Sequence, residues 1–228
     1  MIVIAGTTYR TGTTLVQRLI NTSDEYLIYG EDNAILQCIN NYLVFNHKNK
    51  LRSESQTELF KKNKNSFTPN MLPLEDMPTA CSYFVNYLYS GRGFKVLSPT
   101  LPQIQTLNGI TTKLKIVLMY RNVYDSWASY QNIYNWVDRK TFFSYFNKSR
   151  TLLKAALRGE LDYVYPMRYE NISRDTVNKL FDWLNISNRS KINEVLDLKL
   201  REMTGFDRDD QSYLISRGKV SKNERIEI

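Results

Sequence analysis

The chain has 228 residues, and 31 Lys and Arg against 23 Asp and Glu give it a formal net charge of +8. This length suits one domain with a single core, and 42% hydrophobic and 13% aromatic residues exclude a disordered chain. Two cysteines, Cys38 and Cys81, are too few for a disulfide framework, and the single histidine, His47, excludes chemistry that needs two. No apolar run approaches the ~20 residues that cross a bilayer, and the sequence shows no secretory signal pattern. We therefore expect a basic cytoplasmic protein that binds an anion and does not insert stably into a membrane.

Four short apolar runs predict buried strands, at residues 2–5, 94–97, 114–120 and 163–167. Helices are predicted between them. One begins near Thr13, residues 122–157 form one helix or two with a break near Asp138, and residues 174–185 carry an apolar stripe at helical spacing. Strands that alternate with helices predict an α/β fold with a mainly parallel sheet and right-handed crossovers.

The whole chain, 1–228, is predicted to be a single domain. Residues 46–65 hold six Lys and Arg against two Glu and read as a polar basic insertion. The stretch 204–228 is polar and too short for a second domain.

The loop between the first strand and the first helix has features of a phosphate site. Residues 6–14 read GTTYRTGTT. Glycines allow a tight turn, and the free N–H groups of a helix N-terminus attract anions. Arg10 adds a positive charge and Thr13 and Thr14 add hydroxyl donors; the alternative is a glycine turn with a threonine cap. Five residues separate the two glycines and Thr13 replaces the lysine of a nucleoside triphosphatase loop, which disfavours triphosphate hydrolysis.

This loop resembles the 5′-phosphosulfate-binding loop of sulfotransferases that use 3′-phosphoadenosine 5′-phosphosulfate (PAPS), with Tyr9 where proline is common. The resemblance implies a three-layer α/β sandwich of the P-loop nucleotide-kinase-like sulfotransferase fold. It also implies donor contacts from Arg10, Thr11, Gly12, Thr13 and Thr14.

A second anion site is predicted directly after the third strand, where residues 121–129 read RNVYDSWAS. An arginine at the carboxyl end of a parallel strand lies where open α/β sheets bind ligands, and its planar fork suits a phosphate. The alternative is a structural ion pair between Arg121 and Asp125. The segment resembles the 3′-phosphate motif of the same family, because Arg121, Asn122, Asp125 and Ser129 fall in register. Contacts from Arg121 and Ser129 to the 3′-phosphate are implied.

Three shorter segments resemble other parts of this family. RYEN at 168–171 implies that Tyr169 contacts the nucleotide, and TGF at 204–206 implies contacts from Thr204 and from Phe206, whose ring would pack on adenine. SRGKVSKN at 216–223 resembles a closing loop, in which Arg217 and Gly218 would meet the 3′-phosphate, although its Gly-Asp-Trp part is missing. Residues 204–228 are therefore expected to close over the nucleotide; the alternative is a polar tail.

The catalytic residues implied by the resemblance are Arg10, Lys95 and Glu31. Lys95 lies in GFKVL, which is similar to a Gly-x-Lys-Leu-Met segment of bacterial glycolipid sulfotransferases; the alternative is a surface lysine on a strand edge. Glu31 lies in YGED, like the Gly-Glu segment of the tyrosylprotein, heparan and bacterial branches, where the glutamate is the general base. Asp32 is the fallback, and a helix cap near Asn33 is the alternative role for Glu31. In the cytosolic branch the base is a histidine, and Thr100 stands at that place here.

The resulting expectation is a PAPS-dependent sulfotransferase that moves a sulfuryl group to a hydroxyl of a carbohydrate, lipid or small molecule. It would need no metal, release adenosine 3′,5′-bisphosphate and have no nucleic-acid partner. Two alternatives remain. One is a nucleotide or nucleoside kinase of related fold, which would use magnesium and ATP. The other is a non-catalytic protein that binds nucleotide or nucleic acid.

Overall fold

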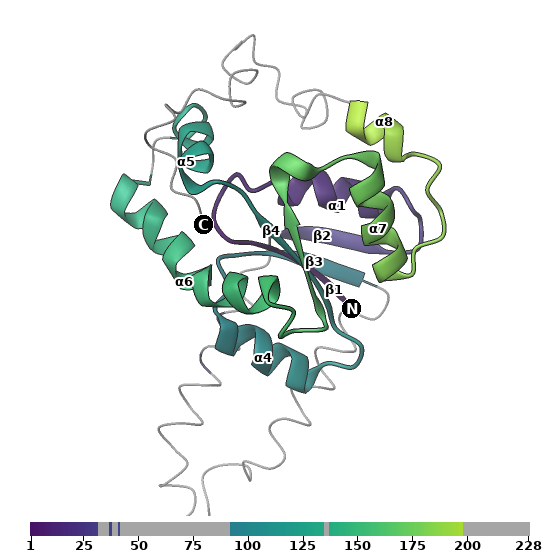
Figure 1. Cartoon of the computed structure of the whole chain (residues 1–228), viewed down its shortest axis with the longest axis horizontal. Coiled ribbons are helices and arrows are strands. Elements are labelled where there is room, and N and C mark those ends of the chain that lie inside the picture. Colours follow the sequence, from purple (N-terminus) through teal and green to yellow (C-terminus); the bar gives the residue numbers. More distant parts are fainter. Residues whose placement is uncertain (32–36, 38–40, 42–91, 135–136, 198–228) are drawn as a thin grey trace, which may run out of the picture.

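The computed structural model describes residues 1–31, 37, 41, 92–134 and 137–197. In this part of the chain, five strands form one parallel sheet in the order β2-β3-β1-β4-β5 (Figure 1). The strands are β1 (Ile2–Gly6), β2 (Leu27–Glu31), β3 (Arg92–Leu97), β4 (Lys115–Tyr120) and β5 (Val164–Arg168). The helices are α1 (Thr13–Asn21), α4 (Leu101–Ile110), α5 (Val123–Gln131), α6 (Arg139–Leu157), α7 (Arg174–Leu184) and α8 (Ile192–Asp197), with a 3-10 turn η1 (Tyr169–Asn171).

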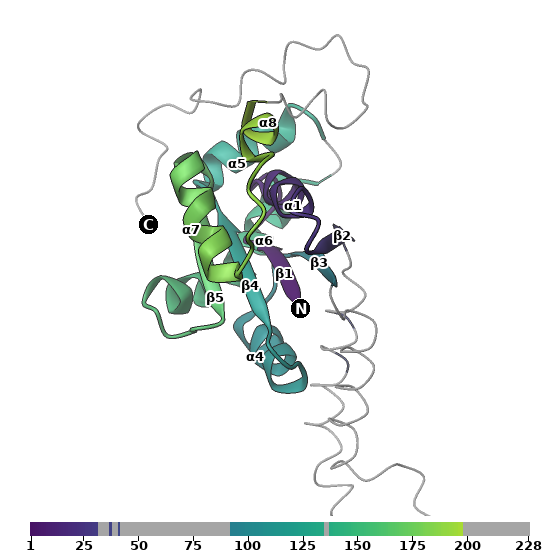
Figure 2. The same cartoon turned by 90° about the vertical axis from the view of Figure 1, so that its right-hand side faces the viewer.

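Helices cover both faces of the sheet (Figures 1 and 2). Successive side chains of β1 point to opposite faces, so that Ile2 and Ile4 join one core, and Val3 and Ala5 join another. The first core is closed by α1, α7 and α8, and the second by α4, α5 and α6. This confirms the predicted α/β fold with a parallel sheet, and it is consistent with a three-layer sandwich.

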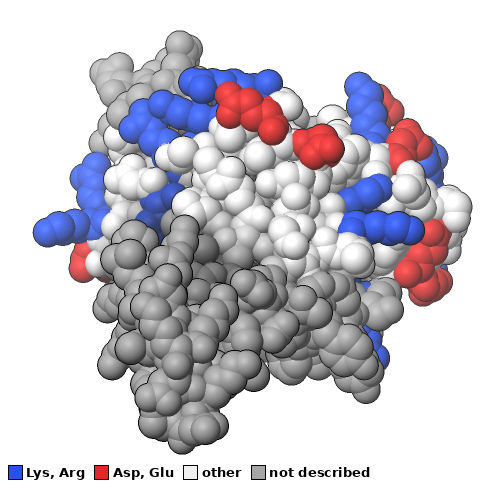
Figure 3. Space-filling view, turned by 90° about the horizontal axis from the view of Figure 1, so that it is seen from below, with Lys and Arg blue, Asp and Glu red and all other residues white. Residues whose placement is uncertain are grey.

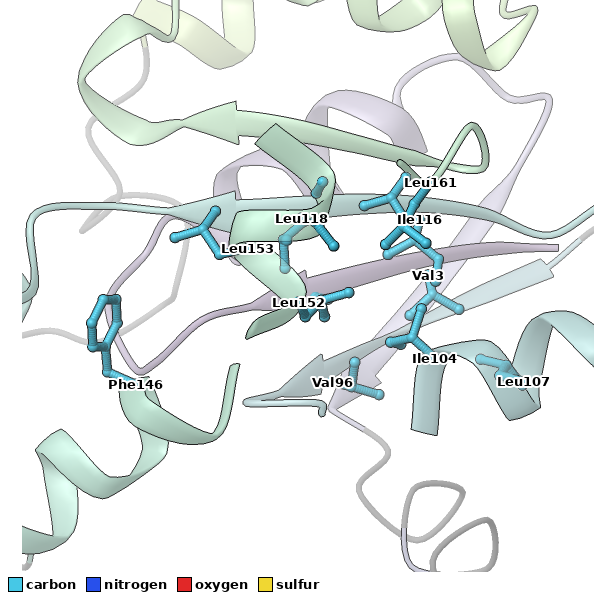
Figure 4. Close-up of a cluster of buried hydrophobic side chains, with 14 of the residues drawn as sticks. Val3, Val96, Ile104, Leu107, Ile116, Leu118, Phe146, Leu152, Leu153 and Leu161 are labelled. Carbon is cyan, nitrogen blue, oxygen red and sulfur yellow. The ribbon is translucent and has the colours of Figure 1, made fainter. Parts of the chain in front are cut away.

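The core under α4 and α6 is the larger of the two and is shown in Figure 4. Its labelled side chains come from three strands, two helices and the turn before β5: Val3, Val96, Ile104, Leu107, Ile116, Leu118, Phe146, Leu152, Leu153 and Leu161. Strands buried on both faces explain why β1 and β4 read as nearly continuous apolar runs in the sequence.

The four predicted strands are all present, but β2 was not predicted. Only Ile28 of this edge strand is buried, and its neighbours Leu27 and Tyr29 are exposed. A strand that packs one side chain into a core leaves no apolar run to recognise. Glu31, the predicted general base, is the last residue of β2 and thus lies at the carboxyl end of a strand.

The helix boundaries follow the capping chemistry of the sequence. The predicted break near Asp138 is the N-cap of α6, where the Asp138 carboxylate accepts a hydrogen bond from the Thr141 N–H at 2.8 Å. Thr100 caps α4 in a capping box with Gln103. Thr100 stands where the cytosolic branch of the resembled family has its histidine base, and here its side chain has a structural role. No helix in the described ranges is long and apolar enough to cross a membrane.

The strand order puts a topological switch point between the carboxyl ends of the neighbouring strands β1 and β4. The chain leaves β1 through α1 on one face of the sheet, and it leaves β4 through α5 and α6 on the other. Loops that diverge to opposite faces from adjacent strands form the usual ligand site of an open α/β sheet. The loops after β1 and β4 are the two segments in which the sequence predicts anion sites.

The basic residues of the chain are concentrated on helix α6 more than on the other described helices. Helix α6 carries Lys and Arg side chains but no acidic residue. Figure 3 shows Lys and Arg side chains on the left-hand side, where Figure 1 places α6, and also on the right-hand side, where Asp and Glu lie among them; most of the described surface between the two sides is uncharged. The positive surplus of the sequence is therefore at least partly concentrated along one helix.

A carboxylate ties the segment before β2 to the segment after α7. Glu25 Oε1 accepts hydrogen bonds from the Ser187 hydroxyl at 2.6 Å, the Ser187 N–H at 2.7 Å and the Asn188 N–H at 3.0 Å. The Ser187 hydroxyl, followed by the two N–H groups, lowers the pKa of Glu25 below its ordinary value of 4.5.

The pH dependence of stability tests this contact. A lowered folded-state pKa stabilises the fold fully above the unfolded-state pKa, and this stabilisation is lost as the pH falls through the folded-state pKa. We expect Glu25→Gln to unfold at lower urea concentration than the parent at pH 7, with a difference that shrinks as the pH falls below about 4. A difference that stays the same from pH 7 to pH 3 would contradict this assignment.

Candidate active site

The loop between β1 and α1 is held in a strained conformation. Arg10 and Gly12 both lie in the left-handed region, with φ of 62° and 92°. The Thr11 hydroxyl donates to the Thr8 carbonyl at 3.2 Å, and Thr8 and Thr11 are buried. A non-glycine residue at positive φ persists only where its surroundings hold it, and such residues concentrate at functional sites.

This loop offers the donors that an anion needs. Gly12 is the N-cap of α1 without a side-chain cap, so the first N–H groups of the helix, at Thr13 and Thr14, have no capping side chain. The Thr7 and Thr8 hydroxyl oxygens are buried in the same loop and, in the described part of the chain, have no hydrogen-bond partner. Buried hydroxyls without partners are rare unless a ligand or water satisfies them, which fits a phosphate at this place.

Tyr169 closes one side of the loop. A Cβ atom on residue 12 would lie 2.5 Å from Tyr169 Cδ2, so only glycine leaves room for this ring. The same ring contacts the second predicted site, since the Arg121 guanidinium carbon lies 4.6 Å from the Tyr169 ring centroid. Tyr169 therefore contacts both the loop after β1 and Arg121.

Substitution of Gly12 by alanine should be costly for this reason. We expect Gly12→Ala to lower the free energy of unfolding by about 2–4 kcal/mol, which combines left-handed strain of roughly 1 kcal/mol with overpacking against Tyr169. Urea unfolding measures the change. Gly159→Ala is the matched control, because Gly159 has φ of 72° but nothing within 4 Å of its added Cβ. Equal losses for the two variants would contradict the packing of Tyr169 on the loop.

Arg121 is buried at the carboxyl end of β4, as predicted, and only 4% of its surface is exposed. Its Nε lies 3.6 Å from Glu170 Oε1, so this ion pair joins Arg121 to η1, directly after β5. Glu170 has a second cation, because the Arg168 Nε–H donates to its Oε2 at 3.1 Å. The Glu170 charge thus stays paired if Arg121 turns towards an anion.

The two predicted anion sites adjoin. The Arg10 Nε–H from the first loop donates to Ser129 Oγ on α5 at 3.3 Å, across 119 residues of sequence. The Thr7 N–H donates to the Met119 carbonyl at 3.0 Å, which joins the loop to the end of β4. Ser129 is buried and lies two turns into α5 from Arg121. One elongated ligand with two anionic groups could therefore contact both loops.

Lys95 lies on the opposite side of the loop from Arg121. It belongs to β3, between β2 and β1, and is 8% exposed, so the alternative of a surface lysine on a strand edge is wrong. Its Nζ donates to Thr14 Oγ1 at 3.2 Å, at the N-terminus of α1. Burial lowers the pKa of Lys95, the charge of Glu31 opposes that shift, and Arg18 adds to it.

A bulge in β2 places Glu31 beside Lys95. Ile28 pairs with Gly93, but three residues of β2 then face two of β3, so that Glu31 pairs with Lys95. Without the extra residue, Gly30 would stand opposite Lys95. Glu31 is exposed, and its charge acts on both Lys95 and Tyr9. An exposed carboxylate and a buried ammonium thus lie next to each other near the start of α1.

Several predicted residues lie outside the described residues: Asp32, Thr204, Phe206, Arg217 and Gly218, with the insertion 46–65 and the segment 204–228. The remaining predicted residues converge on the carboxyl edge of the sheet. Within the described part of the chain, no group of three or more His, Cys, Asp or Glu side chains is placed to hold a metal ion.

The sequence analysis missed two contributors to the site. Glu170 was named only as part of the RYEN segment that resembles the family. Its ion pair with Arg121 joins residues 49 positions apart in the sequence. Tyr9 was noted only as a departure from proline. Its ring contacts Tyr130 of α5 and Tyr145 of α6, and no local sequence pattern predicts this packing.

No family model matches the chain, and no curated protein matches it either.

Proposed function

We propose that this protein is a PAPS-dependent sulfotransferase with the P-loop-like sulfotransferase fold, acting on a hydroxyl acceptor. The observation that supports the proposal is the hydrogen bond from Arg10 to Ser129, which joins the two segments in which the sequence predicts anion sites. PAPS has an anionic group at each end of its ribose, and two adjoining anion sites suit it better than a single one would.

The residues of the loop would bind the 5′ end of the donor. The free N–H groups at the start of α1 and the Arg10 guanidinium complement a phosphosulfate, and the unsatisfied Thr7 and Thr8 hydroxyls add two donors. Arg121 and Ser129 would bind the 3′-phosphate, next to Tyr169. When bound, the donor supplies an activated sulfuryl group whose leaving group is a phosphate.

Glu31 and Lys95 would assist the transfer. The Glu31 carboxylate would accept the proton of the acceptor hydroxyl, since it is exposed at the edge of the sheet where an acceptor can reach it. The Lys95 ammonium would neutralise negative charge near Thr14, and its burial makes that charge act through a low dielectric. Arg10 would stabilise the leaving phosphate from the opposite side of the loop.

Calorimetry with adenosine 3′,5′-bisphosphate tests the proposal, with ATP measured with and without magnesium for comparison. We expect the bisphosphate to bind more tightly than either form of ATP. Arg121→Ala should weaken its binding about 10- to 100-fold, the loss expected for charge-assisted hydrogen bonds. Arg158→Ala is the matched control, because it removes the same charge from an exposed site on the far end of α6.

The alternatives predict different results. A nucleotide kinase would prefer magnesium-ATP, and a non-catalytic binder would bind the bisphosphate but release none from PAPS with any acceptor in a panel of phenols, alcohols and saccharides. Equal affinity for the bisphosphate in Arg121→Ala and Arg158→Ala would contradict the assigned 3′-phosphate site.

A further inference from the structure

The aromatic side chain that precedes Arg10 is anchored in a cluster formed by α5 and α6. The Tyr9 ring lies 5.2 Å from the Tyr130 ring, 6.3 Å from Phe142 and 5.4 Å from Tyr145, which it meets edge-on at 90°. Tyr130 and Phe142 are fully buried, and Trp127 stacks on Tyr130 at 6.0 Å. Aromatic pairs in this geometry stabilise one another beyond the area they bury, so this cluster is a rigid support.

The residue after Arg10 is fixed as well. Thr11 is buried, and its hydroxyl donates to the Thr8 carbonyl at 3.2 Å. Arg10 is therefore the half-exposed residue between two anchored neighbours. Its left-handed backbone, with φ of 62°, is unfavourable for a side chain with a Cβ atom, and such a conformation needs surrounding contacts that hold it.

We propose that Tyr9 is a positioning residue that sets Arg10 against the 5′-phosphate end of the donor site, an inference that rests on the proposed sulfotransferase function. The ring fixes the loop from the side of α5 and α6. Arg10 then donates to Ser129 on α5, so the cluster supports both the loop and the residue that joins the loop to the second predicted anion site.

The chemistry of the Tyr9 hydroxyl fits a role in support. Burial, followed by the neighbouring Tyr145 hydroxyl with which it shares a hydrogen bond, raises the pKa of Tyr9, and the Glu31 charge acts in the same direction. The phenol stays protonated at neutral pH, so it packs and donates but carries no charge for catalysis.

A comparison of two ligands separates positioning from a general loss of structure. Adenosine 3′,5′-bisphosphate carries both phosphates, whereas adenosine 3′-monophosphate lacks the 5′-phosphate that Arg10 would contact. We expect Tyr9→Ala to weaken binding of the bisphosphate about 10-fold and to leave binding of the 3′-monophosphate unchanged. Tyr9→Phe keeps the ring and should bind the bisphosphate more tightly than the 3′-monophosphate, by the same factor as the parent does. A double-mutant cycle should show that Arg10→Ala adds little in the Tyr9→Ala background.

Phe143→Ala is the matched control, because Phe143 packs on Phe142 and Tyr124 of the same cluster. It should lower the melting temperature, as Tyr9→Ala does, without changing the ratio of the two affinities. If Tyr9→Ala weakens both ligands equally, or neither, the positioning role is overturned while the proposed function stands. If the parent binds the bisphosphate no more tightly than the 3′-monophosphate, the 5′-phosphate site itself is wrong, and this inference falls with it.

Discussion

Glu31→Gln should lower the rate of sulfuryl transfer by about 100- to 10,000-fold, the usual contribution of a general base. The amide keeps the size of the side chain but cannot accept the proton of the acceptor hydroxyl. The affinity for adenosine 3′,5′-bisphosphate should stay the same, because Glu31 ends the edge strand and the proposed phosphate contacts come from β1, α1, β4 and α5. Release of the bisphosphate from PAPS with a panel of hydroxyl acceptors measures the rate.

Two control variants sharpen this test. Glu160→Gln makes the same change at an exposed glutamate that pairs with Arg158, and it should leave the rate unchanged. Asp32→Asn tests the neighbouring carboxylate, and it should be much less damaging than Glu31→Gln. A parent-like rate in Glu31→Gln, or a larger loss in Asp32→Asn, would show that Glu31 is not the base.

Lys95→Met should make the protein inactive and more stable at once. Loss of a preorganised cation at the reacting group typically lowers turnover by about 100-fold or more. Removal of a buried charge should raise the free energy of unfolding, on the order of 1 kcal/mol, because burial disfavours the protonated ammonium. Bisphosphate release and urea unfolding measure the two effects.

The pH dependence follows from the direction of the Lys95 pKa. Because the folded-state pKa is lowered, the protonated lysine destabilises the fold fully below that pKa. The penalty disappears as the pH rises from the folded-state pKa to the ordinary value of 10.5. The stability advantage of Lys95→Met should therefore be largest near pH 7 and shrink towards pH 10.

Lys115→Met is the matched control for Lys95→Met. Burial also lowers the pKa of Lys115. This lysine is the first residue of β4, so it lies at the amino ends of the strands, away from the predicted site. There it donates to the Trp183 carbonyl and lies over the Trp183 ring. It should leave turnover unchanged. Equal loss of turnover in both variants would contradict the place of Lys95 in the active site.

The sequence was most informative where local chemistry decides the structure. Buried parallel strands read as apolar runs, and the Asp138 cap marks the start of α6. Strand β2 could not be found in this way, since it buries only Ile28. Its bulge could not be predicted either, because a register shift depends on which strand lies alongside, and the paired residues Glu31 and Lys95 are more than 60 positions apart in the sequence.

The candidate site was predictable in its parts but not in its connections. The loops after β1 and β4 carry their residue types in the sequence, and α/β topology brings such loops to one edge. The pairing of Arg121 with Glu170, the hydrogen bond from Lys95 to Thr14, and the anchoring of Tyr9 join residues from different elements. Such contacts depend on tertiary packing, which no local pattern encodes.

A crystal structure of the protein with adenosine 3′,5′-bisphosphate tests the central claim most directly. We predict a single nucleotide that spans the loops after β1 and β4. Its 5′-phosphate should accept hydrogen bonds from the start of α1 and from Arg10, and its 3′-phosphate from Arg121 and Ser129. A nucleotide bound elsewhere, or one whose 3′-phosphate points away from Arg121 into solvent, would contradict the account.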